Sequence, residues 1–171
     1  MEQFTEEFLA FRDRMEAALP EAFKERERGV MIAGRGCALA AGYSLSCERK
    51  MFGMIGTGSH THSHELRLLF SAPGLTAEDA VGWREYAQAA LKERIKLDRA
   101  HEFTILSIIL ATDGMSRDVI KTLKKSDAEE RYEKPGAGWS QIRFVAADLE
   151  KRKLYPSPLG KLLADLMKGL L

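Results

Sequence analysis

The sequence lacks the features that mark secreted or membrane-spanning proteins. It has two cysteines, Cys37 and Cys47, without CxxC spacing, too few for the disulfide framework of a small secreted domain. Its longest apolar stretches, such as residues 105–111, are far shorter than the roughly 20 residues that a transmembrane helix needs. The N-terminus is acidic and periodic, whereas a signal peptide is basic and then continuously apolar. We therefore expect a soluble, cytoplasmic protein with reduced thiols and no membrane partner.

An excess of charge of one sign is also missing. The 26 Lys and Arg residues balance 25 Asp and Glu residues, for a net charge of +1. This balance gives no general attraction for nucleic acid or anionic lipid, so we expect no nucleic-acid partner. Hydrophobic residues make up 45% and charged residues 30%, as in ordinary globular proteins. A chain of this length can enclose one hydrophobic core, which predicts a single domain over residues 1–171.

Hydrophobic periodicity predicts an α+β fold. Apolar residues at three- and four-residue spacing predict helices over residues 5–28, 77–97, 116–124 and 157–167. Alternating or continuous apolar residues predict strands over residues 39–47, 51–55, 65–70, 103–111 and 141–149. The first three strands read as an antiparallel meander, and the last two as a parallel pair joined by a crossover helix. The expected fold is a mixed sheet of about five strands covered by helices, in the order α-β-β-β-α-β-α-β-α.

Local signals predict the turns and caps between these elements. Thr76 and Asp79 have the spacing of a capping box. Thr57-Gly58 predicts a two-residue hairpin turn, which would place Ile55 opposite His60, Gly53 opposite His62 and Met51 opposite His64. Residues 126–138 predict a long loop.

Three of the four histidines lie in one short segment, at His60, His62 and His64. Alternate residues of a strand point to the same face, so the three imidazoles could lie together. Imidazole is a good ligand for zinc, copper or nickel, and three imidazoles plus water form a catalytic zinc site. His60 and His64 would lie roughly 14 Å apart along an ideal strand, so one ion would take an adjacent pair plus a ligand from elsewhere. The three histidines are the candidate metal site for zinc or another transition metal, and solvated or hydrogen-bonded histidines near a hairpin are the alternative.

Two other catalytic interpretations rest on less specific patterns. Glu48-Arg49-Lys50 matches the ExK tail of restriction-endonuclease-like proteins, whose order of elements is similar. Such nucleases need a second carboxylate to hold magnesium, and residues 30–47 contain no Asp or Glu, so a surface charge cluster at a turn is the alternative. Serine–histidine–acid sites are assembled in space from distant residues. No GxSxG nucleophile elbow indicates one here.

Residues 101–161 carry a resemblance to a known family. They contain HEFTILSIILATDG, SRDVIKTLKK and GWSQIRFVAADLEKRKLYPSPLGK. These segments resemble a family of small uncharacterised proteins found mainly in Gram-positive anaerobic bacteria. The resemblance implies a fold and no mechanism, because the family has no established activity. The histidine cluster lies outside the matching segments.

The sequence as a whole favours a binding or interaction module that self-associates as a homo-oligomer. The last predicted helix is strongly apolar, with Leu159, Leu162, Leu163, Leu166 and Met167. Such a helix, together with an open sheet edge, would be stabilised by a partner. The alternative function is a metal-binding protein or metal-dependent enzyme that uses the histidine cluster. A concave pocket lined by the imidazoles would support this alternative.

Overall fold

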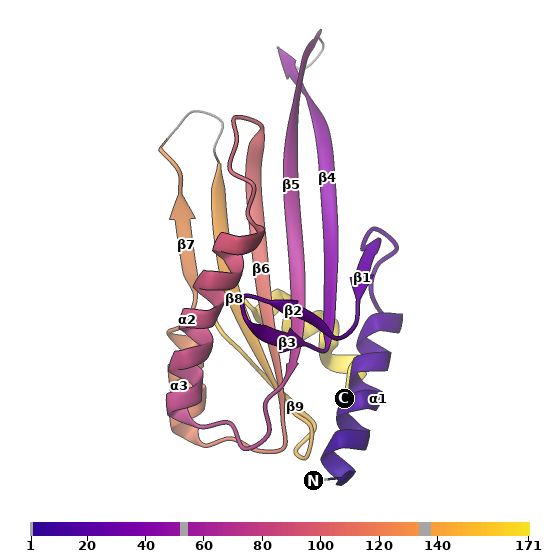
Figure 1. The fold of residues 1–171 in the computed structure, drawn as a ribbon, viewed down its shortest axis with the longest axis vertical. Coiled ribbons are helices and arrows are strands. Elements are labelled where there is room, and N and C mark those ends of the chain that lie inside the picture. The colour runs from indigo at the N-terminus through magenta and orange to yellow at the C-terminus, as the bar shows by residue number, and fades with distance from the viewer. Residues whose placement is uncertain (1, 52–54, 134–137) are drawn as a thin grey trace.

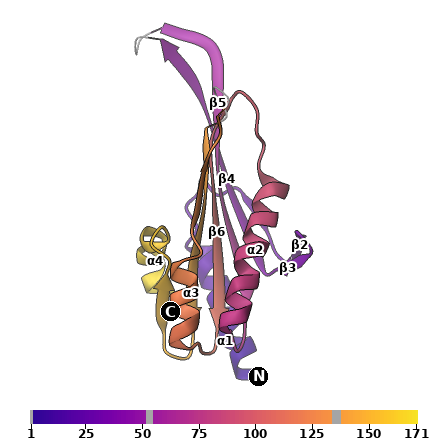
Figure 2. The same ribbon diagram turned by 90° about the vertical axis from the view of Figure 1, so that its left-hand side faces the viewer.

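One mixed β-sheet runs through the molecule and carries helices on both faces (Figure 1, Figure 2). The computed structural model describes residues 2–51, 55–133 and 138–171. In these residues the sheet contains seven strands: β1 (Glu25–Glu27), β4 (Leu39–Met51), β5 (Ile55–Ser71), β6 (His101–Thr112), β7 (Ala128–Arg131), β8 (Trp139–Asp148) and β9 (Lys153–Pro156). The strand order is β1-β4-β5-β6-β8, and β7 and β9 pair with opposite ends of the outer edge of β8.

The helices divide the sheet into two faces. The first face packs against α2 (Ala77–Arg94), α3 (Arg117–Lys124) and a small hairpin of β2 (Val30–Ile32) and β3 (Arg35–Cys37). The second packs against α1 (Glu2–Ala17), α4 (Lys161–Met167) and the short 3-10 helix η1 (Lys168–Leu170). We call these the α2 face and the α1 face. None of the helices in the described residues has the length and hydrophobicity that a membrane span requires.

The core follows the period-two pattern of the strands. Leu68 and Phe70 of β5 point to the α2 face, and Leu69 between them points to the α1 face. In β6, Ile108 and Ile109 are both fully buried on opposite faces. The continuous apolar run of this strand is explained by helices on both sides of it.

The predicted α+β class is confirmed, with a mixed sheet larger than the expected five strands. The parallel pair is formed by β6 and β8, and β5 also runs parallel to β6. The helices α2 and α3 lie in the crossovers. The strands that the sequence did not predict are short, and all three residues of β1 are exposed. Elements this small carry no hydrophobic pattern, so β7 was hidden in the predicted loop over residues 126–138.

The predicted hairpin turn at Thr57-Gly58 is wrong. Both residues lie inside β5, and Met51 pairs with Ile55. The register shifts between Glu48 and Lys50, and Gly58 has a φ of 69°, which glycine adopts at a bulge as readily as in a turn. The predicted partner Gly53 lies outside the described residues.

Three helix boundaries also differ from the prediction. The first helix ends at Ala17 and the second at Arg94. The last helix begins at Lys161, because the Ser157 hydroxyl binds the backbone of Phe144 instead of starting a helix. Side chains that contact distant backbone override the local capping signal here.

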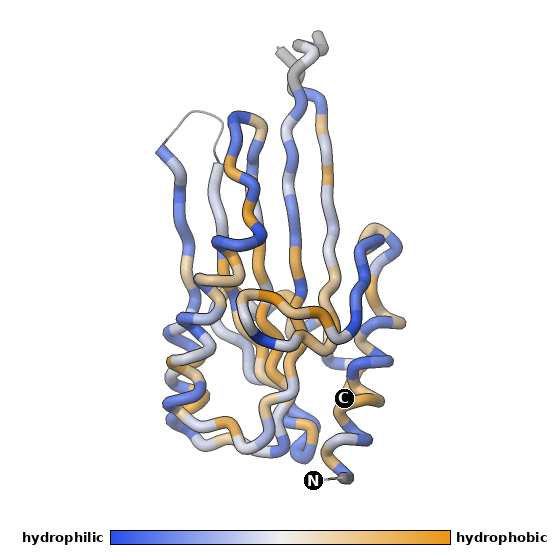
Figure 3. Tube along the Cα trace, viewed as in Figure 1, coloured by the Kyte–Doolittle hydropathy of each residue, from blue (hydrophilic) through white to orange (hydrophobic). Residues whose placement is uncertain are grey.

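The strands β4 and β5 continue beyond the rest of the sheet as a two-stranded ribbon (Figure 1, Figure 2). β1 pairs with β4 only at residues 40–42, and the pairing of β6 with β5 begins at His62. We call residues 43–51 and 55–61 the arm. Figure 3 shows that apolar residues gather where helices cover the sheet, whereas β5 becomes hydrophilic toward the arm. A polar site therefore lies where the apolar core ends.

Candidate functional site

Four polar side chains at the base of the arm form one hydrogen-bonded chain. The Ser44 Oγ atom lies 3.0 Å from His64 Nδ1. The Nε2 atom of His64 lies 2.9 Å from His62 Nδ1, and His62 Nε2 lies 2.8 Å from Asp98 Oδ1. We call this arrangement the Ser44–Asp98 chain. It links a hydroxyl to a carboxylate through two imidazoles.

The sheet register and one loop hold the chain in place. Ser44 of β4 and His64 of β5 are direct cross-strand partners, and His62 and His64 share a face because they are two residues apart. Asp98 lies in the loop after α2, where its Oδ1 atom also accepts a hydrogen bond from the Ala100 amide. The amide of His62 donates to the Ala100 carbonyl. The loop is thus tied to β5, and the carboxylate is positioned before any ligand arrives.

With Asp98 ionised and both imidazoles neutral, each proton of the chain has one position. A carboxylate only accepts, so Nε2 of His62 carries a hydrogen. In neutral His62 the Nδ1 atom then accepts, so Nε2 of His64 donates to it. In neutral His64 the Nδ1 atom accepts in turn, so the Ser44 hydroxyl donates. With both imidazoles neutral, this one arrangement of protons satisfies all three hydrogen bonds, and the lone pair on His64 Nδ1 is directed at the serine hydroxyl.

The electrostatics favour a neutral His64 and an ionised Asp98 at neutral pH. Burial lowers the pKa of His64 below 6.5, and the nearby His62, Lys96 and His101 lower it further. The hydrogen bond from His62 lowers the pKa of Asp98 below 3.8. His64 is therefore neutral and Asp98 ionised, as a base and its anchoring carboxylate should be.

A polar layer continues from the chain across the sheet. His101, which is fully buried, lies with its ring 5.7 Å from the ring of His62. Its Nε2 atom contacts the Thr104 hydroxyl at 2.8 Å. Tyr132 packs edge-on against His101 and places its hydroxyl 2.8 Å from Ser140 Oγ. Polar and aromatic contacts therefore run from His62 through His101 and Tyr132 to Ser140 of β8.

The structure brings together two of the three histidines that the sequence singled out. His62 and His64 are in ring contact, with centroids 5.0 Å apart. His60 is exposed on the arm, opposite Glu48, and is not part of the Ser44–Asp98 chain. Within residues 2–51, 55–133 and 138–171, no three His, Cys, Asp or Glu side chains are grouped so that they could hold a metal ion. The inner nitrogens of the histidine pair instead share a hydrogen bond.

Sequence reasoning missed Ser44, Asp98 and His101. Ser44 follows the alternation of its strand, but only the true register shows that it faces His64. Asp98 is separated from His64 by a whole helix, so no spacing rule connects them.

The sequence also predicts a turn at Lys50, whereas the structure places this residue in β4.

A family model described as a domain of unknown function, DUF8052, matches residues 9–168. The chain belongs to the DUF8052 family. This match confirms the resemblance to an uncharacterised family found in residues 101–161, and it extends that resemblance over most of the chain. Comparison with curated proteins and with solved structures gave no match. Since the DUF8052 description names no activity, the chemistry of the site has to be argued from its geometry.

Proposed function

We propose that this protein is a binding module that self-associates through its α1 face. The supporting observation is the exposure of Leu162 and Leu166, at 67% and 64%. They lie one turn apart on α4, while Leu163 and Met167 point into the core. Two leucines of the apolar last helix are therefore left exposed, because only one side of α4 packs against the core of the protein. Exposed apolar side chains that lie together in one patch, beside a pocket that could accept such a side chain, can form a contact surface.

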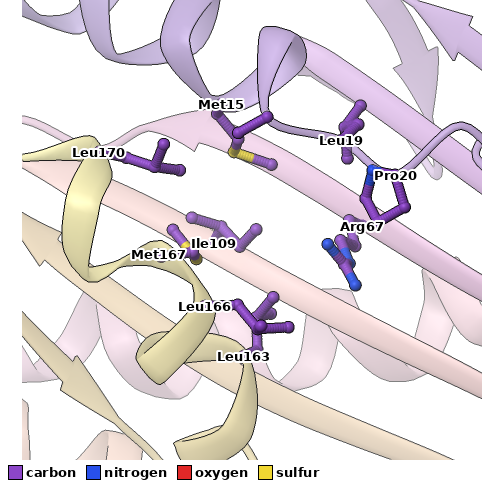
Figure 4. A pocket seen from close by; sticks show the side chains of 10 residues that line it. Met15, Leu19, Pro20, Arg67, Ile109, Leu163, Leu166, Met167 and Leu170 are labelled. Atoms are coloured by element: carbon purple, nitrogen blue, oxygen red, sulfur yellow. The ribbon is translucent and has the colours of Figure 1, made fainter.

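Such a pocket lies between α1 and α4 (Figure 4). It has a volume of about 110 Å³ and is lined mostly by apolar side chains, among them Met15, Leu19, Ile109 and Leu166, together with the charged side chain of Arg67. An apolar cavity of about 150 Å³ can hold benzene, so this one is large enough for the isobutyl group of a leucine. A projecting leucine and a pocket on one face suit a second copy, because a two-fold axis lets each copy fill the other's pocket.

The leucines supply a useful share of the association energy. Full burial of a leucine contributes about 1.5–3 kcal/mol, so a side chain that is two-thirds exposed can gain roughly 1–2 kcal/mol. Two leucines from each of two copies give roughly 4–8 kcal/mol before the entropy of association is subtracted. A micromolar dimer needs about 8 kcal/mol net, so further contacts must contribute. Leu45, 41% exposed on the same face, can extend the contact toward the open edge of β4.

Sedimentation velocity over a range of protein concentrations tests the proposal. We expect a monomer–dimer equilibrium for the wild type and a monomer for Leu162→Glu/Leu166→Glu. Val81→Glu is the matched control, because Val81 is 42% exposed on α2, on the opposite face. This control should dimerise like the wild type. A wild type that stays monomeric at the highest soluble concentration refutes the proposal.

A metal-binding role for His60, His62 and His64, with zinc or another transition metal, stays a prediction. One observation favours it: the outer nitrogens of His62 and His64 are held by Asp98 and Ser44, as the outer nitrogens of metal-bound histidines usually are. Zinc calorimetry with a triple His→Ala control tests it, and an absence of saturable heat in the wild type ends it. The cytoplasmic location also stays a prediction.

A further inference from the structure

The Ser44–Asp98 chain contains the parts of a nucleophilic serine site. A hydroxyl contacts an imidazole nitrogen, and a carboxylate orients the imidazoles behind it, as in hydrolases that use serine. We propose that Ser44 accepts acyl groups from esters, with His64 as its general base and with His62 and Asp98 as positioning residues. This proposal does not depend on self-association, because Ser44 lies on the α2 face and Leu162 on the α1 face.

The Asp98 carboxylate favours proton transfer from Ser44 through His64 toward His62. When Ser44 Oγ attacks a carbonyl carbon, its proton moves to Nδ1 of His64. The Nε2 proton of His64 moves at the same time to Nδ1 of His62. The positive charge then lies on His62, beside Asp98, instead of next to the reacting oxygen. An ion pair with the carboxylate stabilises this state, which is the role of the acid in a serine triad.

The surroundings of Ser44 suit an ester that approaches from solvent. Ser44 is exposed, whereas His64 is partly buried and its Nδ1 atom lies 3.0 Å from the Ser44 hydroxyl. The outer edge of β4 beyond residue 42 pairs with no strand in the described residues. An unpaired edge presents backbone N–H groups, and such groups can stabilise an oxyanion. The substrate class that fits is an unhindered acyl ester.

The reaction balances without a metal or an external oxidant. In acylation the Oγ–carbonyl bond forms, the bond to the leaving alkoxide or phenoxide breaks, and that oxygen takes the proton stored on the chain. In deacylation water attacks the acyl-serine and gives a proton to His64. Ser44 Oγ leaves the carbonyl carbon and regains a proton from His64, and the carboxylic acid is released.

Acetylation by p-nitrophenyl acetate tests the proposal. The measurements are p-nitrophenolate release and tandem mass spectrometry of the protein, in a Cys47→Ser background because Cys47 is an exposed thiol. Cys37 does not compete, since burial raises the pKa of its thiol to about 11. We expect one acetyl group on Ser44, none after Ser44→Ala, and an unchanged rate in Ser46→Ala, which removes an exposed serine of the same strand and face.

Variants of the supporting residues separate base catalysis from a structural role. His64→Asn should slow Ser44 acetylation about 100-fold or more, the usual size of a general-base contribution. Asp98→Asn, which keeps the side-chain shape, should slow it less and move the midpoint of the pH–rate profile to lower pH, because the lost negative charge no longer favours imidazolium. Circular dichroism checks the fold of each variant.

Three outcomes would overturn the proposal. The first is acetylation spread over lysines with no preference for Ser44. The second is an unchanged rate at Ser44 in His64→Asn. The third is loss of acetylation in the presence of a chelator, which would assign the histidine pair to a metal ion.

Discussion

A buried ion pair on the α1 face predicts a large loss of stability on one substitution. Arg143 of β8 is 8% exposed, donates from Nε to Ser107 Oγ at 2.7 Å and from Nη2 to Glu65 Oε1 at 2.7 Å. The same Glu65 oxygen accepts from Arg67 Nε at 2.9 Å. These contacts join three adjacent strands. Burial lowers the pKa of Arg143, and the charge of Glu65 opposes that shift.

Arg143→Met keeps the length of the side chain and removes its charge and donors. It leaves the Ser107 hydroxyl without this partner and Glu65 with Arg67 alone. Breaking a buried pair costs about 3–5 kcal/mol. Since Glu65 keeps one cation, we expect the free energy of unfolding to fall by about 2–4 kcal/mol.

Urea denaturation followed by circular dichroism measures this change. A double-mutant cycle with Glu65→Gln should give a coupling energy of about 1–3 kcal/mol. Lys121→Met is the control, because the pair that Lys121 makes with Asp118 is more than 70% exposed on both sides and should contribute almost nothing. Surface substitutions usually change the free energy of unfolding by less than about 0.5 kcal/mol. If Arg143→Met changes it by no more than this, the argument is refuted.

Three further predictions follow from other parts of the fold. In native protein, Ellman's reagent should modify the exposed Cys47 quickly and the buried Cys37 only after denaturation, because burial raises the pKa of Cys37 to about 11. Gly138→Ala should destabilise the protein by about 2 kcal/mol or more, because Gly138 has a φ of 59° and a Cβ there would lie 1.9 Å from a backbone carbonyl oxygen of β6. Thermal unfolding measures this loss. Gly114→Ala is the control and should change the stability little, because a Cβ at Gly114 would have no atom within 4 Å. Because folding lowers the pKa of His64 below 6.5, the free energy of unfolding should be highest above that pH and should decrease as the pH falls below it. Urea denaturation at pH values on both sides of 6.5 measures this dependence on pH. The dependence should be weaker in His64→Gln.

Features that depend on neighbouring residues could be predicted from the sequence. The capping box predicted at Thr76 and Asp79 is present, with both reciprocal hydrogen bonds. The side chain of Ser116 caps α3, at the start of the helix predicted over residues 116–124. In these cases the donor and acceptor lie within three residues of each other, so the local sequence contains the whole interaction.

The candidate site could be predicted only in part. Clustered histidines were visible, and alternation correctly placed His62 and His64 on one face. The hydroxyl and the carboxylate that complete the chain come from β4 and from the loop after α2. The predicted turn at Thr57-Gly58 gave a different register, in which Ser44 has no relation to His64.

The sequence by itself determined the α+β class, the strand buried on both faces, and the helix starts at Thr76 and Ser116, because periodicity and caps are properties of consecutive residues. Only the tertiary structure decided the register of β4 against β5, the exposure of Leu162 and Leu166, and the meeting of Ser44 with His64, His62 and Asp98. Register depends on the sum of contacts along two whole strands and on what the helices cover. That sum exists only once the sheet has assembled.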